Sequence, residues 1–403
     1  MNSTGNRATD EAINTVINQI ISEIVPKLHP KSIVLTGSFG RDEPAVTINE
    51  GKLKFLSDCE ICIVPNRYIP KKSIEKIKSN LSKMTGLNLT ITRSIGLWIY
   101  SSLPVPNIIS SKIWKRSIQR YDLKHGSKII YGENCLQRTP DFKPEDIPLW
   151  EGIRLVFNRM AEALKYFSID GLYTPEEEME LIYWISKIII ACQDALLLSI
   201  GKYHPSYKIR NHMFQELFPQ YFNELNMKLP NLLPLTVKAT SYKLNPEKDI
   251  YKESVTELWF DVVEICDRVF RYVIKKDMGI TFNSYSEFQE KYLRHPKIRR
   301  EYYNGLFSSP IYRNLTTLFR SHKVLSLRVM KKFKTPWEHI IFSAVPLAYF
   351  SLSRNGRINE FQLEHLRSTL SLFKKLDQKS KNPSEEWEYL KEQLVSLWYV
   401  ICC

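Results

Sequence analysis

The amino-acid sequence predicts an α/β domain at the N-terminal end of the chain, followed by a mostly α-helical C-terminal region. Over about the first 130 residues, short apolar runs typical of strands alternate with segments of helical period, which favours an α/β fold. After residue 149, the periodic segments all have helical spacing. Residues 138–148 (RTPDFKPEDIP) hold three prolines and are interpreted as the linker between the two parts.

The first domain is placed at residues 1–137, and its expected elements follow the apolar pattern. In chain order they are a helix over 13–24, a strand over 32–36, a hairpin over 46–56, a strand over 58–64, a helix over 71–84, a strand over 87–92, a helix over 111–121 and a strand over 128–131. Gly37 directly follows the first strand. The sequence therefore predicts a tight turn there, because glycine permits backbone conformations that other residues avoid.

The second part, residues 149–403, is predicted to be helical. Helices are expected over 149–167, 175–200, 210–217, 251–276, 288–293, 338–351, 360–376 and 385–402. Thr174 and Glu177 form a capping box with Pro175 as the first helical residue, which fixes the start of the second helix. Four prolines between residues 219 and 246 mark a candidate sub-boundary, so the region is interpreted as one or two helical domains.

The composition is that of a globular protein with an excess of positive charge. Hydrophobic residues make up 43% and charged residues 25% of the 403, which excludes wholesale disorder. The chain has 57 Lys and Arg against 43 Asp and Glu, a formal net charge of +14. This excess favours polyanionic partners such as nucleotides or nucleic acid.

The sequence shows no sign of secretion or of a membrane span. The seven cysteines are an odd number without the spacing of a disulfide framework. Residues 1–10 are polar and lack the apolar core of a signal peptide. The apolar run 181–200 is interrupted by Lys187 and Asp194, and the run 340–352 is shorter than the roughly 20 residues that a bilayer requires. We therefore expect a cytoplasmic protein without a membrane partner.

The turn after the first strand has the residues of a phosphate-binding loop. Gly37 allows a close approach of the backbone, and Ser38 adds a hydroxyl beside N–H groups at the start of a helix. Arg41 follows one turn later, where its guanidinium could contact the same anion. Gly37, Ser38 and Arg41 are therefore the candidate nucleotide-binding residues.

A pair of carboxylates opens the strand over residues 58–64. Because side chains alternate along a strand, Asp58 and Glu60 emerge on one face, about 6–7 Å apart. Two carboxylates beside a phosphate-binding turn are the oxygen ligands that Mg²⁺ or Mn²⁺ takes together with phosphates. Asp58 and Glu60 are therefore the candidate metal ligands and catalytic residues. Cys59 and Cys62 have CxxC spacing but face opposite ways on this strand, so they are expected to be packing residues.

These residues resemble the nucleotidyltransferase fold of the DNA polymerase β superfamily. In that family a hydrophobic-Gly-Ser turn precedes an acid pair of the form [DE]-x-[DE], matched here by residues 35–38 (LTGS) and by Asp58 and Glu60. Residues 122–132 (DLKHGSKIIYG) look like the helix–Gly–strand–Tyr-Gly segment that often ends these domains. The resemblance covers about residues 10–137 and implies an α/β (α+β) domain with a mixed sheet.

The resemblance also implies an activity. Gly37 and Ser38 would hold the phosphates of a nucleoside triphosphate, ATP by preference, and Asp58 and Glu60 would hold Mg²⁺ or Mn²⁺. The reaction would be transfer of a nucleoside monophosphate to a small-molecule acceptor with release of pyrophosphate. The helical region would shape the acceptor pocket. This two-part arrangement is similar to that of antibiotic and small-metabolite nucleotidyltransferases.

The sequence departs from the family pattern in two places. Nineteen residues separate the Gly-Ser turn from the acid pair, more than is usual, and the hairpin over 46–56 accounts for the excess. The family normally carries a third carboxylate on the next strand, where this sequence has Asn88, Thr90 and Thr92. The general base is therefore left unassigned.

Several interpretations of the missing acid stay open. The protein could bind a single metal ion, Asp122 or Glu133 could replace the acid, or the chain could be a catalytically inactive nucleotide-binding protein of a regulatory or antitoxin-like kind. Transfer to RNA or protein is a further alternative. The basic runs 291–300 and 328–334 would suit RNA, but a solvated helical face explains them equally well, so nucleic acid is not the favoured partner. The sequence does not indicate an oligomeric state.

Overall fold

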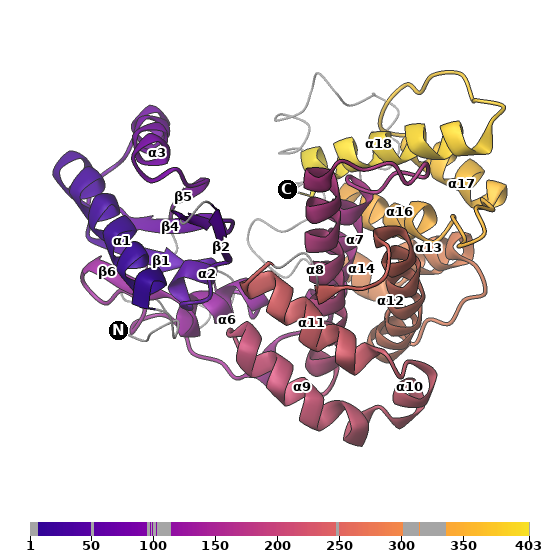
Figure 1. Cartoon of the computed structure of the whole chain (residues 1–403), viewed down its shortest axis with the longest axis horizontal. Helices are drawn as coiled ribbons and strands as arrows, with labels where there is room; N and C mark the ends of the chain where they lie inside the picture. Colours follow the sequence, from indigo (N-terminus) through magenta and orange to yellow (C-terminus); the bar gives the residue numbers. More distant parts are fainter. Residues whose placement is uncertain are drawn as a thin grey trace. The chain divides into compact units, whose positions relative to one another are not determined.

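The computed structural model describes residues 7–49, 52–94, 97, 99, 102, 114–246, 250–300, 314 and 336–402. Contacts between residues divide the chain into two units (Figure 1). The first unit consists of Met1–Ile147, Gly201–Met213 and Thr240–Glu247, and the second unit of Pro148–Ile200, Phe214–Ala239 and Lys248–Cys403. After residue 147 the chain therefore returns twice to the first unit, in segments that the sequence placed in its helical part.

The first unit contains a four-stranded mixed sheet in the order β5-β4-β1-β6. Its strands are β1 (Ser32–Thr36), β4 (Cys59–Val64), β5 (Leu89–Arg93) and β6 (Lys128–Gly132). β1 runs antiparallel to both β4 and β6, whereas β4 and β5 are parallel. The hairpin expected between the Gly-Ser turn and the acid pair is present as β2 (Val46–Asn49) and β3 (Lys52–Phe55). The prediction of a mixed α/β arrangement is confirmed.

Two helices cover the hydrophobic face of the sheet. Helices α1 (Arg7–Leu28) and α3 (Lys71–Thr85) share one cluster of buried residues with β1, β4 and β5. On β4, Ile61 and Ile63 lie in this cluster, while Glu60 is exposed. The alternation of the strand therefore separates the core from the candidate site.

The second unit is helical, as predicted. Its helices are α7 (Leu149–Leu164), α8 (Pro175–Ser199), α10 (Asn223–Lys228), α12 (Val255–Met278), α13 (Tyr285–Arg294), α14 (Pro296–Arg300), α16 (Trp337–Tyr349), α17 (Glu360–Leu370) and α18 (Pro383–Ile401). Helices α9 (Tyr207–Tyr221) and α11 (Leu232–Leu244) each belong partly to the first unit. The capping box of Thr174 and Glu177 is present at the start of α8. The basic run 328–334 lies outside the described residues. The helix expected over 111–121 begins later than predicted, as α6 (Ile118–His125), and residues 111–113 lie outside the described residues.

Helix α8 is a core helix of the second unit. Among the described residues, it is the one helix that is long and apolar enough to cross a bilayer, but 83% of its most apolar window is buried inside the protein. It packs closely against α7, because Gly152 lacks a side chain there: a Cβ on Gly152 would lie 2.9 Å from the Cα of Ala195. Its apolar surface is therefore covered by other helices, and a cytoplasmic location stays a prediction.

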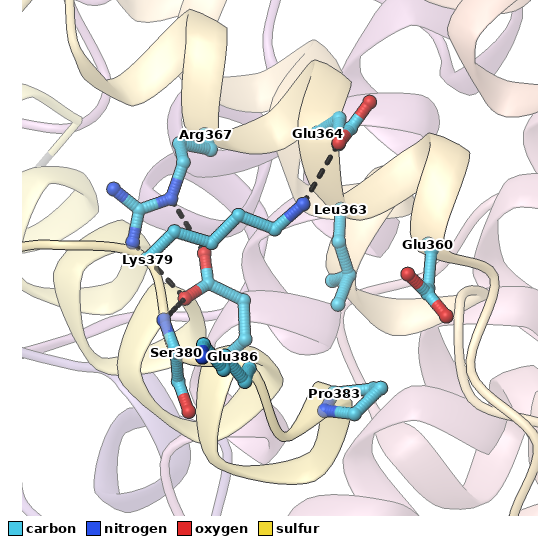
Figure 2. A pocket seen from close by; sticks show the side chains of 9 residues that line it. Glu360, Leu363, Glu364, Arg367, Lys379, Ser380, Pro383 and Glu386 are labelled. Carbon is cyan, nitrogen blue, oxygen red and sulfur yellow. Dashed lines mark hydrogen bonds and ion pairs between the residues drawn. The ribbon is translucent and has the colours of Figure 1, made fainter.

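An ion pair joins α17 to α18 beside a hollow of about 290 Å³ (Figure 2). Arg367 donates from Nε to Glu386 Oε1 (2.5 Å) and from Nη2 to Oε2 (3.0 Å). The backbone N–H of Ser380 also donates to Glu386 Oε2 (3.0 Å). Lys379 pairs with Glu364 across the same hollow (2.8 Å). These contacts hold the connection between the two helices, so the charges of this hollow stabilise the fold.

Replacing Arg367 by methionine is expected to lower the free energy of unfolding by about 2–4 kcal/mol, because the Glu386 side chain is only 4% exposed and would lose its counter-charge. The matched control is Arg268→Met, which breaks the exposed pair with Glu264 and should cost less than about 1 kcal/mol. Urea unfolding at pH 7 measures both. Equal effects would contradict a stabilising role for the Arg367 pair.

The effect of Arg367→Met should also depend on pH. Burial raises the pKa of Glu386, but the hydrogen bonds from Arg367 and Ser380 more than offset this and hold that pKa below its usual value. A lowered carboxyl pKa gives stability that is fully present above the ordinary pKa of about 4.3 and is lost as the pH falls through the folded-state value. Unfolding curves of the two proteins should therefore converge below about pH 4, and a constant difference would show that the ion pair is not the cause.

Candidate functional site

The pairing of β1 with β4 brings the Gly-Ser turn beside the acid pair. Thr36 at the end of β1 lies directly opposite Glu60 on β4. The hydroxyl of Thr36 donates to the carbonyl oxygen of Glu60 (3.3 Å) and to its carboxylate Oε2 (3.4 Å). Gly37 and Ser38 follow Thr36 directly and form the first residues of the one-turn helix α2 (Gly37–Gly40). The Gly-Ser turn and the acid pair, which the sequence predicted to lie beside each other, are therefore adjacent at this end of β1.

Gly37 is the residue that allows this approach. Its φ is +63°, in the left-handed region that residues with a side chain rarely adopt. A Cβ on Gly37 would lie 2.9 Å from both Cδ and Oε1 of Glu60. Any other residue would therefore meet backbone strain and the Glu60 carboxylate at once, so the turn requires glycine for two separate reasons.

Asp58 and Glu60 are both exposed, at the start of β4. Asp58 lies just before the first residue of the strand, and Glu60 follows two residues later, so the alternation of the strand turns them to the same face. Two neighbouring carboxyl groups are tolerated there because water reaches both of them. The pair is accessible to a cation and to a ligand from solvent.

Asn88 contacts the acid pair from the neighbouring strand. Its Nδ2 donates to Asp58 Oδ1 at 2.7 Å, and Thr90 on β5 lies level with Glu60 in the parallel register. The residue just before β5 therefore places an amide, and not a third carboxylate, beside Asp58. The sequence showed three polar residues on this strand, but only the register between β4 and β5 indicates that Asn88 is the one that contacts Asp58.

The cysteine between the two acids has no nucleophilic role. Burial raises the pKa of the Cys59 thiol to about 12, and the negative charges of Glu60 and Asp58 add to this increase. Burial also raises the pKa of Cys62. Both thiols are therefore held in the protonated form at neutral pH, which disfavours a role for either of them as a thiolate nucleophile.

Arg41, the third candidate phosphate ligand, is held by acids of the first unit. Its side chain is 9% exposed, with Nη1 at 3.4 Å from Asp122 Oδ2 and Nε at 3.9 Å from Glu43 Oε2. Burial lowers the pKa of Arg41, but neighbouring Tyr207 and Asp122 more than offset this, so the guanidinium stays charged. A phosphate would have to share Arg41 with these carboxylates, and its role as a nucleotide ligand stays a prediction.

Glu43 fixes the start of α9 to the loop that follows the Gly-Ser turn. This buried carboxylate accepts hydrogen bonds from the hydroxyl of Ser206 (2.6 Å) and from the backbone N–H groups of Tyr207 (2.8 Å) and Lys208 (3.2 Å). A negative charge at a helix N-terminus is favourable, because the first N–H groups of the helix lack partners within it. The chain segment 201–213 is therefore anchored to the turn of the candidate site.

The end of α11 holds the other side of the same loop. Lys243 is 4% exposed, and its Nζ lies 3.3 Å from the hydroxyl of Ser57, the residue just before Asp58. The Ser57 hydroxyl in turn accepts from the backbone N–H of Ala45 (2.8 Å). The sequence did not predict the contacts of Glu43, Lys243 and Asn88, because these contacts join residues that are far apart in the chain.

The two acids considered as replacements for the third carboxylate lie elsewhere in the first unit. Glu133 follows β6, and the β1–β6 register places Gly132 opposite Ser32, at the far end of β1 from Thr36. Asp122 accepts hydrogen bonds from Arg41 and from the hydroxyl of Tyr203 (3.3 Å). The contacts of both acids are thus with residues other than Asp58 and Glu60.

The acid pair fits a cation that arrives with a nucleotide. Within the part of the chain that the structure describes, no group of three or more His, Cys, Asp or Glu side chains is placed to hold a metal ion. Mg²⁺ in proteins is typically bound by one or two carboxylates together with water and substrate phosphates, and Asp58 and Glu60 supply two carboxylates. Asp58 and Glu60 therefore match the protein ligands of such a site, and the other ligands would come from water and phosphate.

Comparisons with known proteins do not test this interpretation. No family model, no curated protein and no solved structure matches the chain. The nucleotidyltransferase resemblance therefore stays a prediction from the sequence, and its support is the geometry of Gly37 beside Glu60.

Replacing Gly37 by alanine is expected to cost about 2–3 kcal/mol of unfolding free energy, because strain at positive φ adds to the clash with Glu60. Gly86→Ala is the matched control, since Gly86 has φ +68° but no atom within 4 Å of the added Cβ, and about 1 kcal/mol is expected. In a Glu60→Ala background, Gly37→Ala should cost no more than Gly86→Ala. Urea unfolding of the double-mutant cycle measures this, and a coupling of zero would contradict the contact.

Proposed function

We propose that the first unit is a magnesium-dependent nucleotidyltransferase that moves a nucleoside monophosphate from a nucleoside triphosphate, ATP by preference, to a small-molecule acceptor. The observation that carries the proposal is the strand pairing that sets Gly37 against Glu60 and exposes Asp58 and Glu60 on one face. A glycine turn beside two exposed carboxylates can receive a triphosphate together with its cation.

The proposed reaction forms one bond and breaks one bond at the α-phosphorus. A hydroxyl oxygen of the acceptor loses its proton and bonds to the α-phosphorus, while the bond to the bridging oxygen of the β-phosphate breaks and pyrophosphate leaves. Bound Mg²⁺ would neutralise charge on the phosphate oxygens. Asp58 and Glu60 would hold the cation from the protein side, and the proton acceptor is unassigned.

The residues of the turn would position the substrate. Gly37 keeps the space in front of Glu60 free of a side chain, and Ser38 offers a hydroxyl at the start of α2. Asn88 fixes the orientation of Asp58 through its hydrogen bond. The loop that carries these groups is held by Glu43 and Lys243, so the site is organised before a ligand binds.

A nucleotide-binding protein without turnover is the second candidate function. It is favoured by one observation: Asn88, an amide, lies beside Asp58 where the related family has a carboxylate. An amide cannot accept a proton at neutral pH and binds cations more weakly than a carboxylate does. The same geometry would then bind a nucleoside triphosphate and signal its presence.

Pyrophosphate release distinguishes the two candidates. The full chain is incubated with each of the four ribonucleoside triphosphates and Mg²⁺ or Mn²⁺, with and without a cell metabolite extract. Transfer predicts release that requires the extract and falls about 100–1000-fold in Asp58→Asn and in Glu60→Gln, because each variant removes a charge that opposes the cation. The exposed residue Glu75 on α3 provides the control Glu75→Gln, which should leave the rate unchanged. Nucleotide binding without release in any combination would favour the second candidate.

Replacing Asn88 by aspartate is expected to strengthen cation binding. In the absence of metal the variant should be less stable than the natural chain, because a new carboxylate faces Asp58. Mn²⁺ should then raise its melting temperature by more than it raises that of the natural chain.

Asn80→Asp is the matched control for this effect, since Asn80 also donates to a carboxylate, Glu23 Oε1, at 2.9 Å. Asn80 lies on α3 and Glu23 on α1, so this control adds an aspartate beside a carboxylate that is not part of the candidate site. An equal response of both variants to Mn²⁺, followed by differential scanning fluorimetry, would argue against a cation site at Asp58 and Glu60.

A further inference from the structure

A cavity of about 420 Å³ lies within the second unit and shares no lining residue with the candidate site of the first unit. It is lined by α12, by the start of α13 and of α17, and by residues that follow α16. Its volume is in the range of sites for small molecules, which is about 300–1,000 Å³. The lining residues determine which kind of molecule would fit.

The charged side chains of the lining are already paired. Asp267 accepts from Arg271 Nε at 2.8 and 3.0 Å and from the hydroxyl of Tyr285. The two other charged lining residues, Glu264 and Arg354, have counter-charges in Arg268 and Asp261. The cavity therefore presents balanced charge, and an ionic ligand would have to displace an existing pair.

One wall of the cavity is aromatic and flat. The rings of Tyr285 and Phe350 stack at 4.4 Å between centroids and 11° between planes. The guanidinium of Arg271 lies 5.3 Å from the centroid of the Tyr285 ring. A planar ring system can extend such a stack, since aromatic pairs favour offset parallel arrangements.

The side-chain oxygen of Gln362 is a hydrogen-bond acceptor that receives no hydrogen bond. Its side chain lines the cavity, the residue is 6% exposed, and its Oε1 is buried with no hydrogen-bond partner. The backbone N–H of Gln362 donates to Asn359 Oδ1 (3.1 Å), which caps α17 and fixes the position of Gln362. A buried acceptor left unpaired costs about 1–3 kcal/mol, which a ligand N–H would offset.

We propose that this cavity binds the base of a nucleoside: an uncharged planar heterocycle with N–H donors. A ring stacked against the aromatic wall accounts for Tyr285 and Phe350, and the side-chain amide of Gln362 would pair with the hydrogen-bonding edge of the base. Balanced charge selects a nucleoside over a nucleotide. This site is separate from Asp58 and Glu60, and the inference does not depend on the proposed transfer reaction.

Calorimetric titration of the full chain with adenosine, guanosine, cytidine and uridine tests the proposal. At least one nucleoside should bind at a ratio of one per chain. Gln362→Leu should weaken that binding at least tenfold, whereas Gln220→Leu, a change of the same kind at an exposed position of α9, should leave it unchanged. Asp58→Asn should also leave it unchanged, which keeps this site distinguishable from the candidate nucleotide site.

Stability of the free protein separates a ligand-binding role of Gln362 from a structural one. Leucine has a similar volume and removes the unpaired oxygen, so free Gln362→Leu should melt no lower than the natural chain. Saturating nucleoside should raise the melting temperature of the natural chain and leave that of the variant almost unchanged.

Four results would overturn the proposal. They are no binding of any nucleoside, equal binding by Gln362→Leu, loss of binding in Asp58→Asn, and binding of glucose, a neutral non-planar probe, with an affinity equal to that of the nucleosides. A free Gln362→Leu protein that melts well below the natural chain would assign Gln362 to the fold instead.

Discussion

The antiparallel register of β1 and β4 is the constraint on which the first unit depends. It sets Thr36 opposite Glu60, and the same pairing places Ile61 and Ile63 in the hydrophobic cluster under α1 and α3. A slip of one residue would turn Glu60 into that cluster and expose the isoleucines, because strand side chains alternate. Burial of an unpaired carboxylate costs several kcal/mol, so the packing of the core and the position of the candidate acids are determined together.

Local pattern predicted the parts of the fold that local physics determines. The strand before Gly37, the hairpin, the acid pair on β4 and the capping box at Thr174 follow from residues within a few positions of one another. The contact between Glu43 and Ser206 joins residues 163 positions apart, and no sequence pattern signals it. The contact of Asn88, the residue just before β5, with Asp58 likewise depends on the register of β5 with β4. The sequence therefore indicated the Gly-Ser turn and the acid pair, but not the contacts of Glu43 and Asn88 that hold them.

The returning segments of the first unit explain how an exposed site can be rigid. Arg41, Arg210 and Lys243 are almost fully buried, and the rings of Tyr203 and Tyr207 lie against them. Glu43 and Asp122 are the counter-charges of Arg41, whereas Arg210 donates to the backbone carbonyl oxygens of His204 and Pro205 and Lys243 lies beside the hydroxyl of Ser57. Glu43 and Ser57 are tied to the later segments by hydrogen bonds with Ser206 and Lys243, and Arg41 by its contact with the ring of Tyr207. The backbone that carries the two carboxylates is therefore held in place, and Asn88 and Thr36 add hydrogen bonds to Asp58 and Glu60 themselves.

The amide of Asn88 affects how a cation and a nucleotide would bind together at Asp58 and Glu60. Without a third acid the total repulsion between carboxylates is smaller in the absence of a metal ion, and Asp58 gains a hydrogen bond from Asn88 as well. The same arrangement offers a cation fewer charges, so the remaining oxygen ligands have to come from phosphate and water. Cation and nucleotide would then each raise the affinity of the other by the same factor, as linkage requires. A site of this kind would respond more strongly to the metal–nucleotide complex than to free metal, whether the chain transfers the nucleotide or only binds it.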